Sequence, residues 1–297
     1  MANLRDIRRR IKSVKNTAQI TRAMQLVAAA KMKKAQDQAV AGRDYANQLN
    51  QVLVNLKENI EEESHPLLQA REGKRELMLV ISTDKGLCGA LNTNLLKKVR
   101  SESGTETHFV TVGRKLRTIL GKMGREMLAD FEVKDPVPFA EARPISRFLT
   151  KQFLDGHYDK ISIAFNNFVT VMNQEPTVIQ LLPLSSDKVG EKQDFEGVGN
   201  HVAETDKSAA LGKDYTFEPS PMQVLDTLLP LYINFQVYQT LVEARASEHS
   251  ARMVAMKAAT DNAKKFIKEL TLEYNKARQA AITSELLEIT TAMKAME

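Results

Sequence analysis

The sequence predicts an α/β protein in which long N- and C-terminal helices form an antiparallel coiled coil, with a central Rossmann-like α/β domain between them. Two observations carry this prediction. All nine prolines lie between Pro66 and Pro230, and Gly42 is the only glycine outside that window. Inside the window, apolar runs of strand length alternate with helix-like segments, which is the pattern of an α/β domain with a largely parallel sheet.

The absence of helix breakers at both ends sets the expected domain boundaries. A proline costs a helix interior about 3 kcal/mol and a glycine about 1 kcal/mol, so their joint absence selects for continuous helices. We expect an N-terminal helix over residues 1–65, a central domain over 66–220 with an exposed polar loop at about 185–215, and a C-terminal helix over 221–297. At ~1.5 Å per residue each helix would run about 90–100 Å. Such a length favours a shaft, a tether or a spacer.

The N-terminal segment carries a heptad seam, which predicts one partner helix. Steps of three and four residues connect Leu4, Ile7, Ile11, Val14, Ala18, Thr21, Gln25, Ala28, Met32, Ala35, Ala39, Gly42, Ala46, Leu49, Leu53, Leu56 and Ile60. A second apolar stripe is formed by Ile20, Ala23, Met24, Val27 and Ala30. The second stripe is more than one partner helix covers, so it predicts either a further partner or packing on the chain's own domain.

Charge is unevenly distributed along the chain. Residues 1–43 hold eleven Lys and Arg against only Asp6 and Asp37, whereas the whole chain has a net charge of +5. This basic helix could meet nucleic acid, anionic lipid or an acidic protein surface, or it could be a solvated helix face. A single cysteine and the lack of an apolar signal segment indicate a protein of a reducing cytosol. No stretch reaches the roughly 18 apolar residues that cross a bilayer.

The middle of the chain is read as alternating strands and helices. Strands are expected at Leu77–Ser82, His108–Val112, Ile161–Phe165 and Thr177–Leu182. Helices are expected at Leu91–Arg100, Arg114–Lys122 and Arg143–Leu154.

The loop Thr83–Asn94, which reads TDKGLCGALNTN, follows a strand and precedes a helix. A phosphate-binding turn would occupy this place, but neither glycine-rich phosphate motif is present, so a tight turn explains the loop. Cys88 has no histidine close in sequence, and the five histidines show no metal-binding spacing. We therefore expect no catalytic constellation, no metal and no cofactor.

The C-terminal segment repeats the period of the N-terminal one. Its seam runs through Met253, Met256, Thr260, Ala263, Ile267, Leu270, Tyr274, Ala277 and Ala281. Beyond it, Glu285–Glu297 still contains Leu286, Leu287, Ile289, Met293 and Met296. An apolar tip on a solvated helix predicts a receiving socket on another protein, and a frayed terminus is the alternative.

Three long segments together resemble the gamma subunit of F-type ATP synthase. They are IRRRIKSVKNTAQITRAMQLVAAAKMKKAQ (residues 7–36), STDKGLCGALNTN (82–94) and EHSARMVAMKAATDNAKKFIKELTLEYNKARQAAITSELLEI (248–289). The resemblance implies a non-catalytic rotor shaft of a bacterial ATP synthase. Its coiled coil would stand inside a ring of alpha and beta subunits, and its α/β domain would contact the epsilon subunit and the membrane c-ring. The chain would then lie at the cytoplasmic face of the inner membrane as a peripheral protein.

The resemblance also implies partner contacts for individual residues. Contacts with the beta subunits of the ring are implied for Met24, Arg252, Arg278, Gln279 and Thr283. Cys88 and Tyr215 are implied to lie at the foot, near epsilon and the c-ring. The tail TTAMKAME is bulkier and more charged than the small-residue tail usual in the family, which bears on how deeply the helix inserts.

Two other classes of function were weighed from the residues. A basic coiled-coil scaffold that binds nucleic acid would lose affinity steeply with salt, but Tyr45 is the only aromatic residue before residue 100. A nucleotide-dependent α/β enzyme would need the phosphate motifs that the central segment lacks.

Overall fold

The computed structural model describes residues 4–42, 45, 48–49, 52–53, 65–71, 73–184, 218 and 220–296. Tyr215 and the expected loop at 185–215 lie outside these residues. The chain divides into two compact units. One unit comprises Met1–Ala28 with Met253–Glu297, and the other comprises Ala29–Arg252. Helices α1 (Leu4–Ala41) and α6 (Pro221–Met296) each contribute to both units.

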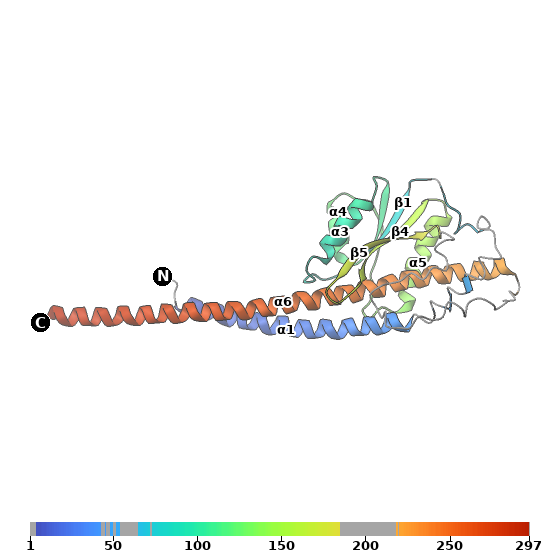
Figure 1. Ribbon diagram of the computed structural model, residues 1–297. Coiled ribbons are helices and arrows are strands. Elements are labelled where there is room, and N and C mark those ends of the chain that lie inside the picture. Colours follow the sequence, from blue (N-terminus) through green and yellow to red (C-terminus); the bar gives the residue numbers. More distant parts are fainter. Residues whose placement is uncertain are drawn as a thin grey trace. The chain divides into compact units, whose positions relative to one another are not determined.

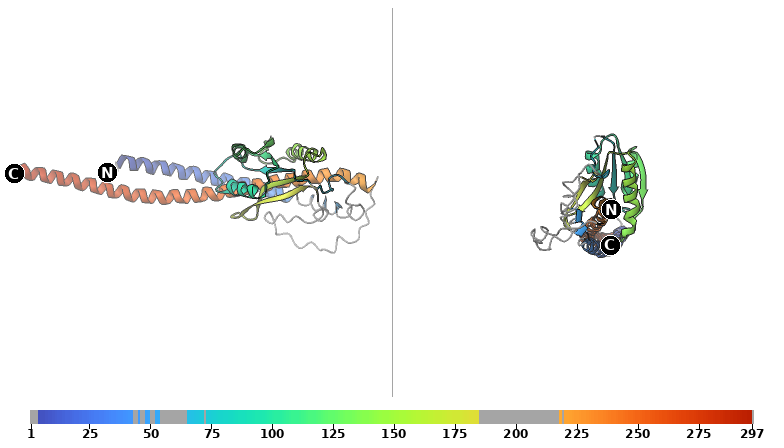
Figure 2. Two further views of the ribbon diagram at one scale, coloured as in Figure 1. Left: turned by 90° about the horizontal axis from the view of Figure 1, so that it is seen from above. Right: turned by 90° about the vertical axis from the view of Figure 1, so that its right-hand side faces the viewer.

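The first unit is a pair of helices that run side by side in opposite directions, as Figures 1 and 2 show. Thr21 and Thr260 face each other across the pair, with 2.7 Å between their Oγ1 atoms. The seam positions predicted from the sequence are the buried or half-buried ones, and nearly all other positions on both helices are exposed. The fully buried seam residues are Ile7, Thr21, Ala28, Met256, Thr260 and Ala263. The antiparallel coiled coil expected from the heptads is therefore confirmed.

The second apolar stripe stays uncovered by this pairing. Ile20 and Val27 on α1 remain 60% and 57% exposed, and Leu26 beside them is 57% exposed. A neighbouring helix buries only one side of α1, because its contact surface spans little more than a heptad seam. The unit thus presents apolar side chains that its own two helices do not bury.

A five-stranded sheet forms the centre of the second unit. Its strands are β1 (Glu76–Ile81), β2 (Thr107–Val112), β3 (Met127–Phe131), β4 (Lys160–Phe168) and β5 (Gln174–Leu182). Their order is β3-β2-β1-β4-β5, and only the β4–β5 pair is antiparallel. The largely parallel sheet predicted from the alternating pattern is confirmed, and β1, buried on both faces, is apolar almost throughout.

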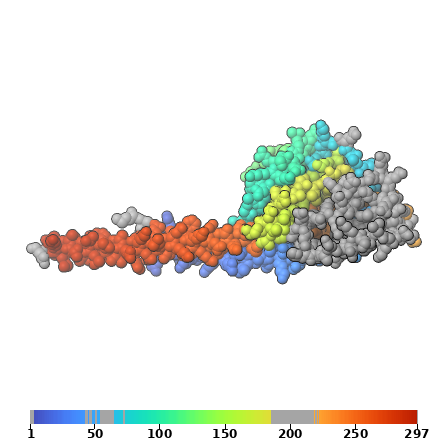
Figure 3. Space-filling view, viewed as in Figure 1, coloured from blue at the N-terminus to red at the C-terminus, as the bar shows by residue number. Residues whose placement is uncertain are grey.

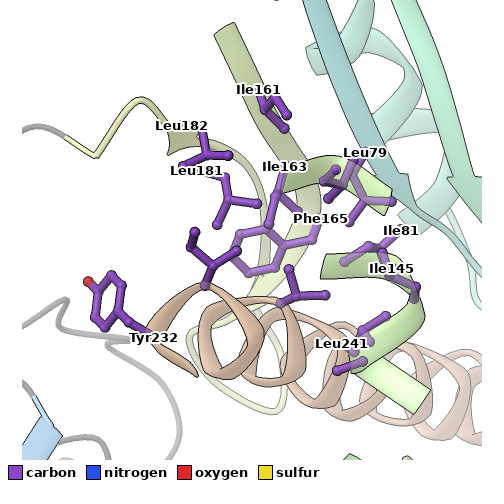
Figure 4. Close-up of a cluster of buried hydrophobic side chains, with 14 of the residues drawn as sticks. Leu79, Ile81, Ile145, Ile161, Ile163, Phe165, Leu181, Leu182, Tyr232 and Leu241 are labelled. Atoms are coloured by element: carbon purple, nitrogen blue, oxygen red, sulfur yellow. The ribbon is translucent and has the colours of Figure 1, made fainter. Parts of the chain in front are cut away.

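Helices cover both faces of the sheet. On one face α3 (Leu91–Glu102) and α4 (Arg114–Lys122) pack through Leu95 and Leu116 against Met78 and Val80. On the other face, Ile163 and Phe165 of β4 point toward α6 and α5 (Phe139–Leu154), where Leu241 and Ile145 meet them (Figure 4). Alternate residues of the strands therefore enter two separate cores, as the period of two requires.

Strand β3 was missed in the sequence analysis. It lies at the edge of the sheet, where its residues MLADF are half-exposed, so no apolar run marks it. Helix α3 continues two residues beyond the expected end, to Glu102. The strands also extend by one to three residues at some of their ends, because half-buried residues there continue the ladder without an apolar signal.

Two helices contain a proline, and one of them, α5, begins four residues before its expected start at Arg143. Helix α5 begins at Phe139 and contains Pro144, and α6 begins at Pro221 and contains Pro230. A proline in a helix lacks the N–H that its fourth preceding carbonyl would accept, at a cost of about 3 kcal/mol. In α6 the buried side chains of Leu225, Leu229 and Ile233 flank Pro230. Burial of each contributes about 1.5–3 kcal/mol, which offsets that cost.

Candidate functional site

Helix α6 passes through three environments along its length. Residues 243–251 are all buried inside the second unit. Residues 253–281 bury one face against α1 within the first unit, and residues 282–296 are exposed on every side. We call residues 243–251 the held segment, residues 253–281 the paired segment and residues 282–296 the bare segment. The held segment and the bare segment are the candidate functional regions.

The bare segment is apolar. We name it the apolar tip, and its large side chains are Ile282, Leu286, Leu287, Ile289, Met293 and Met296, with exposed fractions of 48% to 91%. In Figure 3 this red end of α6 has no other described segment beside it. Single exposed apolar residues are ordinary, but a contiguous group is typical of a surface that another protein covers.

Arg245, Glu248 and Arg252 lie on one side of α6 and connect the held segment to the loop that follows β1. Arg245 donates to Glu248 at 2.8 Å, to Asp84 at 3.2 Å and to the carbonyl oxygen of Val133 at 2.9 Å. Arg252 donates to the other oxygen of Glu248 at 2.7 Å. Burial favours a lower pKa for Arg245, but Glu248 and Asp84 outweigh it and raise the pKa above its usual value. The stripe is therefore a buried Arg–Glu–Arg cluster.

Arg252 also reaches the loop that follows β1. Its Nη2 lies 3.3 Å from the carbonyl oxygen of Lys85 and 3.4 Å from that of Gly86. The next residue, Leu87, is 61% exposed and has a φ of 63°, a left-handed conformation that is uncommon for a residue with a side chain. The loop is thus tied to α6 and displays an apolar side chain.

Two serines hold α6 from a different direction. Ser247 Oγ donates to the carbonyl oxygen of Asn166 in β4 at 2.8 Å. Ser250 Oγ donates to the carbonyl oxygen of Val171, in the turn between β4 and β5, at 2.7 Å. We call the Arg–Glu–Arg cluster, these two serines and their partners the junction.

Asp135 joins α1 to α6 beside the junction. Its Oδ2 lies 3.2 Å from His249 Nε2 on α6 and 2.7 Å from Lys31 Nζ on α1. The hydrogen bond from His249, with that from Lys31, outweighs burial and holds the pKa of Asp135 well below its usual range. Asp135 is therefore a carboxylate that bridges two helices of the second unit.

The junction occupies the place where a doubly wound sheet would bind a ligand. In the order β3-β2-β1-β4-β5, the strand order reverses between the parallel strands β1 and β4, and ligands of such folds bind at the carboxyl ends of the strands there. Asp84 follows β1 and Asn166 is in β4, and both are bound by α6, through Arg245 and Ser247. Side chains of α6 therefore bond to the chain on both sides of this switch point.

Two further histidines have structural partners. His65 lies 3.1 Å from Asp226, and His108 lies 2.7 Å from the hydroxyl of Tyr158. Within the described ranges, no group of three or more His, Cys, Asp or Glu side chains could hold a metal ion. The same part of the chain contains no helix with the length and apolar character of a membrane span.

The residues implied to contact the ring occupy different settings. Met24 is half-buried on α1 in the first unit, whereas Arg252 belongs to the junction of the second. Arg278, Gln279 and Thr283 are exposed on α6, and the Thr283 hydroxyl donates to the carbonyl oxygen of Gln279 at 2.9 Å.

The foot residues differ again. Cys88 is 3% exposed and packs with Leu91 and Ala251, next to the loop carbonyls that Arg252 binds. Cys88 and Arg252, which were assigned to different partners, thus lie in the same part of the structure, where α6 meets the loop after β1. Tyr215 lies outside the described residues.

The sequence analysis missed Arg245 and Glu248. Their spacing with Arg252, three and then four residues, places all three on one helix face and was a readable signal of an ion stripe. The sequence could not show that the stripe is buried.

These features define an α/β protein with a coiled coil, an exposed apolar tip and a helix bonded to the sheet domain at the carboxyl ends of its strands. Residues 3–296 match the family described as ATP synthase. The chain is 50% identical to the ATP synthase gamma chain of Akkermansia muciniphila over the full length of both, and 50% identical to that of Opitutus terrae over 98% of each. The chain belongs to the ATP synthase gamma chain family. The central-stalk rotor function expected from the sequence follows from this membership.

Solved structures give the same fold. The chain resembles a chain of the Euglena gracilis mitochondrial ATP synthase rotor with a TM-score of 0.65, at 18% identity, covering 94% of this chain and 98% of that one. A chain of the Tetrahymena thermophila mitochondrial ATP synthase central stalk and c-ring matches with a TM-score of 0.58, at 23% identity, covering 81% and 99%. The fold of the coiled coil with its α/β domain is therefore that of central-stalk chains.

Proposed function

We propose that the chain is a non-catalytic shaft whose paired helices turn inside a ring of alternating alpha and beta subunits. An asymmetric shaft contacts each beta subunit differently at any instant. Only such differential contact can bias the open and closed states of a nucleotide site. The turning of the shaft would in this way couple ion flow through the membrane sector to ATP synthesis or hydrolysis on the partner subunits.

The apolar tip is the observation that carries this proposal. Every position of residues 282–296 is exposed, which leaves space for a sleeve around the helix. Five of the six large apolar side chains follow one another at steps of three and four residues from Ile282 to Met296, and they form the apolar stripe that such a sleeve would cover. Apolar contact is non-directional, which lets a helix turn within such a sleeve without breaking fixed polar bonds. The charged Lys294 and the terminal Glu297 of the atypical tail would set how far the helix enters.

Contacts with beta subunits are proposed for Met24, Arg252, Arg278, Gln279 and Thr283. Arg278 and Gln279 are supported by their exposure about one turn before the tip, and Thr283 is supported by its exposure within the tip. Arg252 has a side chain only 12% exposed and already bonded to Glu248, so it would act through the loop whose carbonyls it holds. Met24 lies beside the uncovered stripe of Ile20 and Val27, which a ring subunit would cover.

The basic start of α1 adds an electrostatic contribution. Arg8, Arg9 and Arg10 are exposed there, and an acidic loop of a beta subunit is the partner that this charge fits. Each exposed ion pair would contribute about 0–1 kcal/mol. Family membership favours this protein partner, and nothing in the structure or the relatives supports the nucleic-acid scaffold.

The α/β domain is proposed as the foot of the shaft, in contact with the epsilon subunit and the c-ring, with Cys88 and Tyr215 near that contact. Leu87, exposed beside the buried Cys88, is the side chain of this loop that a partner would cover. The chain would lie at the cytoplasmic face of the bacterial inner membrane, attached through its partners.

The non-catalytic role is supported by the position of α6 at the switch point. Arg245 of α6 bonds to Asp84 in the loop after β1, and Ser247 bonds to Asn166 in β4, where a substrate of an α/β enzyme would bind. An enzyme would need this helix to withdraw, against a buried ion cluster and an apolar core.

Reconstitution tests the proposal. ATP hydrolysis is measured for the organism's alpha and beta subunits assembled with this chain, for the same subunits without it, and for the chain alone. We expect robust turnover only in the complete assembly and none from the chain alone. Equal turnover with and without the chain would exclude the shaft, and turnover by the chain alone would exclude the non-catalytic role.

A further inference from the structure

The junction holds α6 from two opposite sides. Successive residues of a helix are rotated by about 100°, so Arg245, Glu248 and Arg252 share one stripe of α6. By the same rotation Ser247 and Ser250 fall on the opposite side of the helix. The first set bonds to the loop after β1 and the second to β4 and the turn that follows it.

This arrangement resists rotation of the helix about its own axis. Apolar packing opposes separation of a helix from a sheet, but it is non-directional and tolerates side chains that slip past one another. Charge-assisted hydrogen bonds are short and directional. Hydrogen bonds on opposite sides of one helix must all stretch when the helix turns about its axis, so together they oppose its rotation in either direction.

The position of the junction along α6 fits a mechanical role. Arg252 is the last residue of the second unit, and from Met253 onward α6 belongs to the paired helices. Helices α1 and α6 both run from one unit into the other, so a twist that passes between the α/β domain and the paired helices travels along these two helices, and the part that α6 carries passes through this segment. Glu248 is central to the cluster, because each of its oxygens accepts a bond from a different arginine.

We propose that the junction transmits torque between the α/β domain and α6 by preventing the helix from turning within the domain, and that Glu248 is its positioning residue. We call the junction in this role the torque clamp. Glu248 touches no reacting group. It holds Arg245 on Asp84 and Val133 and holds Arg252 on Lys85 and Gly86, so that the domain and the helix turn as one body. This inference rests on the proposed rotor function and extends it to the site where the load is carried.

The first test uses the complete membrane-bound ATP synthase with Glu248→Gln in this chain. The amide keeps the shape of the side chain but removes the charge that holds both guanidinium groups. We expect ATP hydrolysis to continue while ion pumping per ATP hydrolysed falls by roughly 2- to 30-fold, the range of coupling changes that single residues produce. Asp261→Asn is the matched control, since Asp261 forms an exposed pair with Lys264 on the same helix. This control is expected to pump normally.

The second variant removes the serine hydrogen bonds on the other side of α6. It also provides a test if the Glu248→Gln variant fails to assemble. Ser247→Ala with Ser250→Ala removes two hydroxyl donors without adding bulk or charge. A fall in pumping per ATP in this double variant supports the clamp. Unchanged pumping per ATP in both the Glu248→Gln and the serine variants overturns it.

A disulfide between α6 and the loop after β1 distinguishes rotation of α6 within the domain from a general loss of structure. Cys88, the only cysteine of the chain, packs beside Ala251 on α6, so Ala251→Cys places a second thiol against it. In a chain that carries Glu248→Gln and Ala251→Cys, oxidation to the disulfide is expected to restore pumping per ATP, and reduction is expected to abolish the gain. A disulfide that forms without restoring pumping overturns the clamp.

The outcome is distinguishable from failure of the proposed function. If the chain is not the rotor, omitting it leaves ATP hydrolysis by the alpha and beta subunits unchanged. If only the clamp is wrong, omission abolishes turnover while the clamp variants couple ATP hydrolysis to pumping normally.

Discussion

The held segment and the apolar tip of α6 are two regions of one helix with opposite surroundings. Residues 243–251 are buried and tied by ion pairs and hydroxyl bonds, whereas residues 282–296 are exposed and mainly apolar or weakly polar. Directional polar bonds fix a helix in one rotational setting, and apolar contacts leave its rotation free. One continuous helix can therefore be fixed by polar bonds in one segment and remain free to rotate against a partner in another.

The largest expected effect is on stability, and it compares the same substitution at a buried residue just before the held segment and at a residue of the apolar tip. Leu241 is 2% exposed and Leu286 is 57% exposed. Leu241→Ala leaves a cavity between α6, α5 and β4 and should lower the free energy of unfolding by about 2–5 kcal/mol. Leu286→Ala should change it by less than about 0.5 kcal/mol. Urea unfolding of the two full-length variants measures both, and equal losses would contradict the comparison.

The apolar tip should reverse that ranking when binding is measured. If a sleeve of the ring buries Leu286, its truncation loses about 1.5–3 kcal/mol of apolar contact, or roughly 10- to 100-fold in affinity. Titration of the chain against assembled alpha and beta subunits gives the affinity. Glu285→Ala on the same exposed segment serves as the control and should have a much smaller effect. Full affinity in Leu286→Ala would mean that the tip turns in solvent.

The helices and their seams could be predicted from the sequence because their signals are local. The heptad positions from Ile7 to Ala39 and from Met253 to Ala281 are the buried or half-buried ones, since burial there depends on a single partner helix of the same period. The end of the seam at Ala281 also marks where pairing stops. Strand β3 could not be predicted, because an edge strand that is half-exposed has no apolar run.

The junction could be predicted only in part, because it depends on contacts between distant parts of the chain. Arg245, Glu248 and Arg252 read as an ordinary solvated stripe of a helix, and only the fold brings Asp84 and Val133 to them. Cys88 and Arg252 were assigned to separate partners for the same reason. Their closeness follows from the path of α6 across the carboxyl ends of the strands, which no local pattern encodes.

The contribution of Asp135 to the free energy of unfolding should depend on pH. Asp135 bonds to His249 in the held segment. The pKa of Asp135 is lowered in the folded chain, so its stabilising effect is fully present above its unfolded pKa of about 4 and is lost as pH falls toward the folded value. At pH 7 Asp135→Asn should cost about 1.5–3 kcal/mol, the contribution of hydrogen bonds to a charged group. The cost should shrink progressively below pH 4.

Asp6 supplies the comparison for this pH dependence. It pairs with Arg9 on α1 at 3.1 Å, but the two side chains are 52% and 82% exposed. Asp6→Asn should therefore change stability by only about 0–1 kcal/mol. Chemical unfolding of both variants between pH 3 and pH 7, the range that spans ordinary carboxyl pKa values, gives the two curves. A constant cost for Asp135→Asn across the range would show that its charge does not carry the effect.

The smallest expected effect lies in the paired segment between the two regions. Thr21 and Thr260 share a buried hydroxyl bond, and each hydroxyl also lies within bonding distance of a carbonyl of its own helix, Ala18 at 3.2 Å and Met256 at 2.8 Å. Thr21→Val should cost about 1 kcal/mol, because it leaves Thr260 with only its local partner. The double variant with Thr260→Val should cost less than the sum of the two single variants, since both polar groups are then gone. Strict additivity in this double-mutant cycle would mean that the two helices recognise each other through their apolar seam alone, and that the polar grip on α6 is confined to the junction.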